Sequence, residues 1–148
     1  MAEVPQVDGT GRVLVVDDDR DFAAFYVDIL EAQGLVVEVA STADEAVRRL
    51  EAQPAGFDVV LLDQKLHGPG GPSSGLDLIA PIRALAPCVE IVLVTGYATP
   101  DVIRLALQRG ANDCLIKTGD FEHHVRTKVR VGLAATRARA ARRVPSVR

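Results

Sequence analysis

Residues 58–63 read DVVLLD, four apolar residues that end directly in a carboxylate. A run this short, rich in branched aliphatic residues and without polar alternation, is typical of a strand buried on both faces of a sheet. Similar runs recur as RVLVVDD at residues 12–18, VEIVLVT at 89–95 and DCLIK at 113–117. We therefore predict several buried strands, each of which ends in a polar or charged side chain.

Segments with the spacing of amphipathic helices separate these strands. Gly34 and Gly110 mark helix ends, and Thr42 stands three residues before Glu45 as in a capping box. Pro81 is expected to bend or shorten the third helix. The predicted strands cover residues 12–16, 35–39, 58–62, 89–94 and 113–116, and the helices cover 20–33 and the stretches that begin after Thr42, at Leu76, after Thr99 and at Phe121.

Five repeats of strand then helix predict an α/β fold with a doubly wound, five-stranded parallel sheet. Right-handed crossovers place helices on both faces of such a sheet. Its ligand site lies at the carboxyl ends of the strands, near the switch in strand order. The polar residues that follow the strands are therefore the candidates for function.

The length of 148 residues suits one domain, for which we predict a flexible segment 1–11, a domain over 12–135 and a basic helix end or linker over 136–148. All 20 acidic residues and nine basic ones fall in residues 1–122, whereas residues 123–148 hold eight basic residues and no acidic ones. Without aromatic residues, this basic end does not predict nucleic-acid binding. No signal or membrane-length apolar run is present, and Cys88 and Cys114 form no disulfide framework, which favours the cytoplasm.

The strand ends bring together three carboxylates, a hydroxyl and an amine. Asp17 and Asp18 follow the first strand, Asp63 the third, Thr95 the fourth and Lys117 the fifth. Clustered carboxylates repel one another unless a cation is present, and Mg²⁺ prefers such oxygen ligands. A lysine and a hydroxyl suit phosphate oxygens, so the set predicts a site for a transferring phosphoryl group.

The pieces VLVVDDD, DVVLLD, IVLVTG and GANDCLIK resemble the four motifs of the response-regulator receiver family, in the same order and at similar spacing. The resemblance covers about residues 12–135 and implies the flavodoxin-like receiver fold, (βα)5. It implies that Asp63 is the phosphoacceptor, that Thr95 is the switch hydroxyl and that Lys117 contacts the phosphoryl group. The implied donor is a sensor histidine kinase or a phosphotransfer protein.

The same resemblance implies a Mg²⁺ site. Asp18 and Asp63 would be direct ligands, Asp17 would hold the metal partly through water, and the backbone carbonyl of Lys65 would be a further ligand. Asp19 is interpreted as a helix cap. These roles make the chain a phosphoacceptor switch rather than an enzyme acting on another substrate.

Three positions depart from the family pattern. Thr118 follows Lys117 where the family usually has proline, so we expect a trans bond and a changed loop. Cys114 stands where an aromatic residue is common, which weakens the usual coupling to the switch hydroxyl. The loop after Asp63 is long, with Gly75 twelve residues on, and its insertion GPGGPSS is expected to be mobile and to cover the site or contact a partner.

Two other functions stay open. Asp17-x-Asp19 after an apolar strand resembles the haloacid-dehalogenase-type phosphatases, in which Asp17 would be the nucleophile; no cap domain is evident. A receiver-like module that binds partners without phosphorylation is the other. For a receiver we expect a downstream protein or effector domain as partner, output through the face of the fourth and fifth helices, possible homodimers through that face, and no contact with nucleic acid or membrane.

Overall fold

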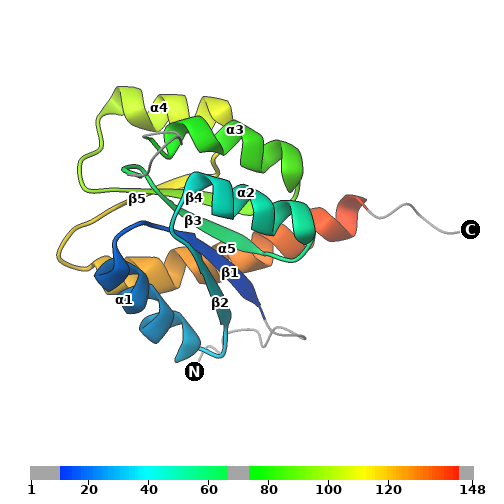
Figure 1. Ribbon diagram of the computed structural model, residues 1–148, viewed down its shortest axis with the longest axis horizontal. Coiled ribbons are helices and arrows are strands. Elements are labelled where there is room, and N and C mark those ends of the chain that lie inside the picture. Colours follow the sequence, from blue (N-terminus) through cyan, green and yellow to red (C-terminus); the bar gives the residue numbers. More distant parts are fainter. Residues whose placement is uncertain (1–10, 67–73, 144–148) are drawn as a thin grey trace, which may run out of the picture.

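The structure of the protein is a computed structural model that describes residues 11–66 and 74–143. Its five strands form one parallel sheet in the order β2-β1-β3-β4-β5 (Figure 1). The elements are β1 (Arg12–Val16), α1 (Arg20–Glu31), β2 (Val36–Ala40), α2 (Ala43–Ala52), β3 (Val59–Asp63), α3 (Leu76–Leu85), β4 (Glu90–Thr95), α4 (Pro100–Arg109), β5 (Asp113–Ile116) and α5 (Phe121–Arg143). The predicted α/β fold with its five-stranded parallel sheet is confirmed.

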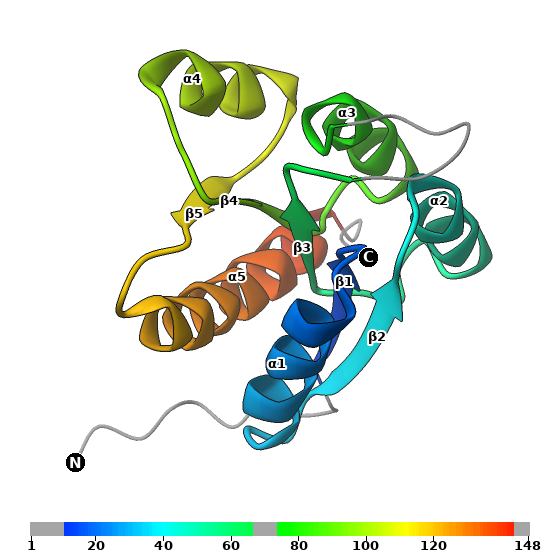
Figure 2. The same cartoon turned by 60° about the vertical axis from the view of Figure 1, so that its left-hand side comes forward.

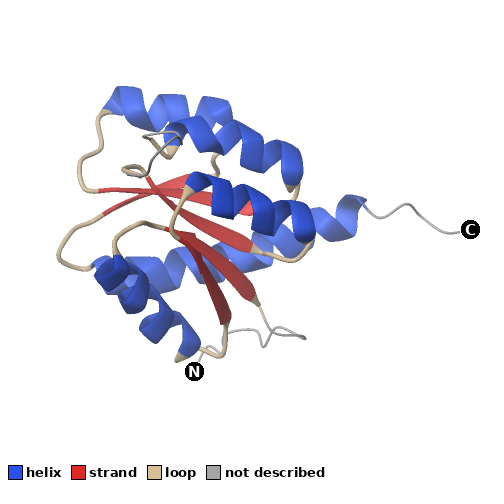
Figure 3. Cartoon of the chain, viewed as in Figure 1, coloured by secondary structure: helices blue, strands red, loops and turns tan. Residues whose placement is uncertain are grey.

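The strands alternate their side chains between two cores. Leu14 and Val16 of β1 pack with α2, α3 and α4, whereas Val13 and Val15 pack with α1 and α5. The sheet thus lies between a layer of three helices and a layer of two (Figure 3). Burial on both faces explains why the strand sequences are continuously apolar.

Local sequence signals set most helix ends as predicted, although α1 ends at Glu31, two residues before the predicted limit at residue 33. Asp19 caps α1, because its carboxylate accepts the backbone N–H groups of Asp21 and Phe22. Thr42 and Thr99 cap α2 and α4 in the same way. Gly110 ends α4 with a φ of 116°, in the left-handed region that glycine adopts without strain.

Pro81 does not end α3, contrary to the expected shortening. The helix runs from Leu76 to Leu85 with Pro81 inside it. Pro81 is exposed, and so is Asp77, whose carbonyl loses the N–H partner that proline cannot supply. Water can reach that carbonyl, which makes the lost hydrogen bond less costly.

The basic end of α5 is attached to the sheet. Arg139 donates to the Glu90 carboxylate at 2.7 Å and to the Cys88 carbonyl at 3.1 Å, and the Thr136 hydroxyl contacts the carbonyl of Asp58. Arg137 lies 3.7 Å from the Asp58 carboxylate. The helix therefore continues across the predicted boundary at residue 135, and part of the basic charge that the sequence concentrates there neutralises acids of the sheet.

Two further predictions, the flexible N-terminal segment and the lack of a membrane-length apolar run, can be compared with the structure only in part. The flexible N-terminal segment lies outside the described residues, apart from Gly11. None of the helices in the described ranges is both long enough and apolar enough to span a bilayer.

Candidate functional site: carboxylates at the strand ends

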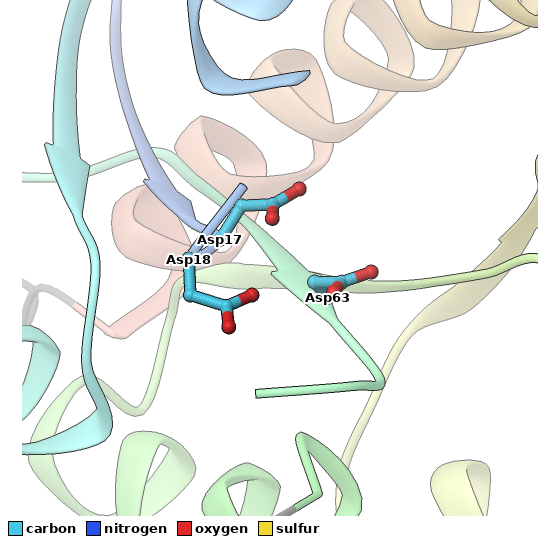
Figure 4. A group of neighbouring side chains, drawn as sticks. All are labelled: Asp17, Asp18 and Asp63. Atoms are coloured by element: carbon cyan, nitrogen blue, oxygen red, sulfur yellow. The ribbon is translucent and has the colours of Figure 1, made fainter. Parts of the chain in front are cut away.

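The three predicted carboxylates meet at the carboxyl ends of β1 and β3. One oxygen from each of Asp17, Asp18 and Asp63 lies within 4.8 Å of the others (Figure 4). The register of the parallel strands causes this meeting, because β1 and β3 are neighbours and end at the same edge of the sheet (Figure 2). The backbone N–H of Asp17 donates to the Ala40 carbonyl of β2 at 3.0 Å, which fixes the chain where it leaves β1.

Two of the carboxylates are almost removed from solvent. Asp17 is 2% exposed and Asp63 is 7% exposed. Burial, with the nearby charge of Asp63 adding to it, raises the pKa of Asp17 to about 6, although the Asp19 N–H favours its ionised form. Burial also raises the pKa of Asp63, and the Lys117 ammonium opposes that rise.

Asp17 leaves one oxygen without a protein partner. Its Oδ1 accepts the backbone N–H of Asp19 at 2.9 Å, but its buried Oδ2 has no hydrogen bond to any residue of the described ranges. A buried, unpartnered carboxylate oxygen beside two other carboxylates is poorly satisfied by the protein alone. The donor set of three carboxylates suits a hard divalent cation.

Lys117, the residue directly after β5, joins the carboxylates. Its ammonium nitrogen lies 3.1 Å from Oδ1 of Asp63 and 4.2 Å from the centre of the Phe22 ring. The backbone N–H of Lys117 donates to the Thr95 carbonyl at 2.9 Å, which extends the pairing of β5 with β4. No peptide bond within the described ranges is cis, so the bond before Thr118 is trans as expected.

Thr95 is buried at the end of β4, and its hydroxyl is already engaged. It accepts the Tyr97 N–H at 3.1 Å, and it lies within hydrogen-bond distance of the Gln64 side-chain oxygen and the Tyr97 carbonyl. The sequence prediction missed Gln64, although its place directly after Asp63 was a usable signal. It also missed Phe22, which reads in the sequence as one more residue of an apolar helix face.

Backbone contacts join the two ends of the loop that follows Asp63. Lys65 and Ser74 form an antiparallel bridge, and the Gly75 N–H donates to the Gln64 carbonyl at 2.7 Å. Most of the insertion GPGGPSS, for which we expect mobility and a covering role, lies outside the described residues, as does His67. Lys65 lines the same cleft as the carboxylates.

Gly75 is required by its close approach to Asp63. A Cβ atom at this position would stand 2.2 Å from the Asp63 carbonyl oxygen, a backbone atom that cannot move aside without disturbing β3. We expect Gly75→Ala to lower the free energy of unfolding by about 2–3 kcal/mol, measured by urea denaturation. Gly119→Ala is the control, since a Cβ there meets no atom within 4 Å. Equal stabilities of the two variants would contradict the prediction.

All predicted site residues line one cleft of about 880 Å³. Its wall consists of Asp17, Asp18, Asp19, Asp63, Gln64, Lys65, Thr95, Gly96, Tyr97, Thr99, Val102 and Lys117. Cys114 is not among them; it is half-buried and packs against the core beneath α2, α3 and α4. The cleft therefore combines four aspartates with two lysines, Lys65 and Lys117, and the buried hydroxyl of Thr95.

Comparison with known proteins identifies relatives for most of the chain. Residues 13–128 match the response regulator receiver domain family. The alginate biosynthesis transcriptional regulatory protein AlgB of Pseudomonas aeruginosa is 37% identical over 107 residues, which cover 72% of this chain and 22% of AlgB. The acid tolerance regulatory protein ActR of Sinorhizobium medicae is 32% identical over 110 residues, which cover 74% of this chain and 54% of ActR. The chain thus spans about a fifth of AlgB and about half of ActR.

Solved structures agree with this assignment. A CheY-like receiver domain protein from Methanospirillum hungatei superposes with a TM-score of 0.79 and 28% identity, covering 88% of this chain and 99% of that one. A response regulator from Burkholderia pseudomallei, solved with a phosphorylated aspartic acid, calcium ion and citrate, superposes with a TM-score of 0.71 and 30% identity, covering 93% of this chain and 77% of that one. With its sheet order, its acidic cleft and the family match over residues 13–128, the chain belongs to the response regulator receiver domain family.

Proposed function

We propose that this receiver domain accepts a phosphoryl group on Asp63 with Mg²⁺ bound beside it. The observation that carries the proposal is the placement of Asp63 between two further carboxylates and the Lys117 ammonium, 3.1 Å away. The Burkholderia pseudomallei neighbour, which has a phosphorylated aspartic acid and a calcium ion, supports it. The phosphoryl donor is a sensor histidine kinase or a phosphotransfer protein of a two-component system.

The residues present fit the proposed metal. Asp18 and Asp63 would offer carboxylate oxygens directly, and Asp17 would offer its unpartnered Oδ2 directly or through water. The backbone carbonyl of Lys65, a residue that lines the same cleft, would be a further ligand. Burial raises the pKa of Asp17 and so disfavours its charged form, and a divalent cation would offset that cost. When bound, Mg²⁺ would supply positive charge against the oxygens of the transferring group.

The chain's own groups have separate tasks in the transfer. A carboxylate oxygen of Asp63 attacks the phosphorus of the phosphohistidine, forming a P–O bond as the P–N bond breaks, and the leaving imidazole takes up a proton. Lys117 neutralises charge on the phosphoryl oxygens. The Thr95 hydroxyl then donates a hydrogen bond to the new phosphoryl group, which requires the contact between this hydroxyl and Gln64 to break. The product is an acyl phosphate that water hydrolyses.

The geometry favours Asp63 over Asp17 as the nucleophile. Lys117 lies against Asp63, whereas Asp17 is the more buried carboxylate and has Oδ1 occupied by the Asp19 N–H. In the phosphatase alternative Asp17, and not Asp63, would be the nucleophile. Incubation with acetyl phosphate and Mg²⁺, followed by mapping of the labile mass gain, separates the functions. Label on Asp63 supports the receiver, label on Asp17 with rapid turnover supports the phosphatase, and a folded protein without label supports the phosphorylation-independent binding module.

The output surface is proposed to be the face of α4, β5 and α5. Large hydrophobic side chains are exposed along this side of the molecule: Tyr97 is 79% exposed, Leu107 48% and Ile116 41%. A downstream protein, an effector domain or a second copy of the chain would cover them. We place this switch in the cytoplasm, acting through protein contacts rather than by turnover of another substrate.

Phosphorylation is expected to shift backbone NMR signals along this face. Acetyl phosphate with Mg²⁺ should move the amide signals of α4 and β5 in addition to those around Asp63, because Thr95 at the end of β4 is pulled toward the phosphoryl group. The Asp63→Asn variant under the same conditions is the control for donor and metal. Shifts confined to the loop after Asp63 would count against this output face.

A further inference from the structure

Lys117 leaves the sheet into a segment that gives its side chain little support. Thr118, Gly119 and Asp120 are all exposed, and a Cβ at Gly119 would have no atom within 4 Å. A lysine side chain has a flexible four-carbon stem, so holding its ammonium at one point has an entropic cost. Its ion pair with the Asp63 carboxylate is a single contact of 3.1 Å.

A second contact fixes the ammonium from the side of α1. The Lys117 nitrogen lies 4.2 Å from the centre of the Phe22 ring, well inside the range of a cation–π interaction. Phe22 is the third residue of α1 and is half-buried. The ammonium therefore lies within reach of both a ring face and the carboxylate of Asp63.

The Phe22 ring is itself held in place by other rings. Its centre lies 5.7 Å from that of Phe25, 5.5 Å from that of Tyr26 and 5.5 Å from that of Phe121. Its backbone N–H donates to the Asp19 cap at 3.1 Å. Because Phe121 is the first residue of α5, the cluster also joins the end of the exposed segment to α1.

We propose that Phe22 is a positioning residue, whose ring holds the Lys117 ammonium beside Asp63 so that it is in place when the phosphoryl group arrives. This inference rests on the proposed phosphoryl transfer to Asp63. It gives an apolar residue of α1 an indirect role in phosphoryl transfer. Phe22 touches neither phosphoryl group nor metal, and acts through Lys117 alone.

The test compares phosphorylation rates of matched variants at saturating Mg²⁺ with acetyl phosphate, a donor that needs no partner surface. Phe22→Leu removes the ring face and should slow label uptake by about threefold to tenfold. Phe22→Tyr keeps a ring face and should restore most of the rate. Phe57→Leu removes the ring under Arg12 in the other core, away from Lys117, and should keep the wild-type rate, with unfolding curves recorded for every variant.

Two readouts distinguish positioning from loss of stability. The Mg²⁺ concentration for half-maximal rate should be the same in Phe22→Leu and wild type, because Lys117 is not a metal ligand. The ring current of Phe22 should shift the Lys117 Hε proton signals upfield in wild type and Phe22→Tyr, but not in Phe22→Leu. A folded Phe22→Leu protein with the wild-type rate, equal slowing by Phe57→Leu, or failure of Phe22→Tyr to restore the rate would overturn the proposal.

Failure of the proposed function gives a different pattern. In that case wild type and every variant stay unlabelled, while the Lys117 Hε shift still reports whether the ring holds the ammonium. Absence of this shift from the wild-type spectrum would overturn the placement of Lys117 whatever the chemistry of the domain.

Discussion

The Asp63→Asn variant does not gain the mass of a phosphoryl group when it is incubated with acetyl phosphate and Mg²⁺. Asparagine has nearly the same shape as aspartate but no anionic oxygen to attack phosphorus, so we expect label uptake to fall by at least about two orders of magnitude. Intact-protein mass spectrometry at neutral pH measures the uptake. The fold is expected to persist, because the substitution removes a carboxylate whose pKa burial already raises.

Asp28→Asn is the matched control for this experiment. Asp28 is an exposed acid of α1 that does not line the cleft, and its replacement makes the same change in net charge. It should be labelled at the wild-type rate. If Asp63→Asn retained label and Asp17→Asn lost it, the assignment of the nucleophile would be wrong and the phosphatase interpretation would replace it.

Asp17→Asn is expected to stabilise the metal-free protein at neutral pH and to abolish most of its response to Mg²⁺. Burial and the charge of Asp63 raise the pKa of Asp17 to about 6 from an ordinary 3.8. The folded state therefore binds this proton more tightly than the unfolded state does. The charged form destabilises the fold by on the order of 2–3 kcal/mol above pH 6.

The sign of the pH dependence follows from that difference. Between about pH 4 and pH 6 the folded chain holds more protons than the unfolded one, so the contribution of Asp17 to stability falls as the pH rises through this window. Below about pH 4 Asp17 is protonated in both the folded and the unfolded state and does not destabilise the fold. Above about pH 6 the full destabilisation by its charged form is present. Asparagine removes this slope while its side-chain oxygen can still accept the Asp19 N–H.

Urea denaturation at pH 7.5 measures both effects. In EDTA, Asp17→Asn should exceed wild type by about 2 kcal/mol in free energy of unfolding. Added Mg²⁺ should stabilise wild type, because it binds the folded state through the clustered carboxylates, and should stabilise the variant much less. An Asp17→Asn protein that is less stable than wild type in EDTA would show that its carboxylate is satisfied without metal.

Short-range signals account for the parts of the fold that were predicted from sequence. The five strands, the caps at Asp19, Thr42 and Thr99 and the left-handed end at Gly110 are each set by residues within a few positions of one another. Some predicted strand limits differ by one residue from the observed ones. β3, for example, includes Asp63, because this residue pairs with β4. Pro81 does not shorten α3, because the cost of proline in a helix depends on exposure, which a local pattern does not contain.

Contacts between distant segments account for what the sequence prediction missed. The ring of Phe22 under Lys117, the side chain of Gln64 against Thr95 and the pairing of Arg139 with Glu90 each join residues on different elements. No local period or motif encodes such a contact. It arises only when the sheet order brings the elements together.

By itself, the sequence determined the order of the elements and the residues at the strand ends, because burial on both faces leaves an apolar run whose last residue faces the rim. It thereby placed Asp17, Asp18 and Asp63 at one edge of the sheet. Only the tertiary structure decided which oxygens lack partners, how far the carboxyl pKa values rise and what holds Lys117 in place. These properties depend on distance and solvent exclusion between segments far apart in the chain, and packing sets both.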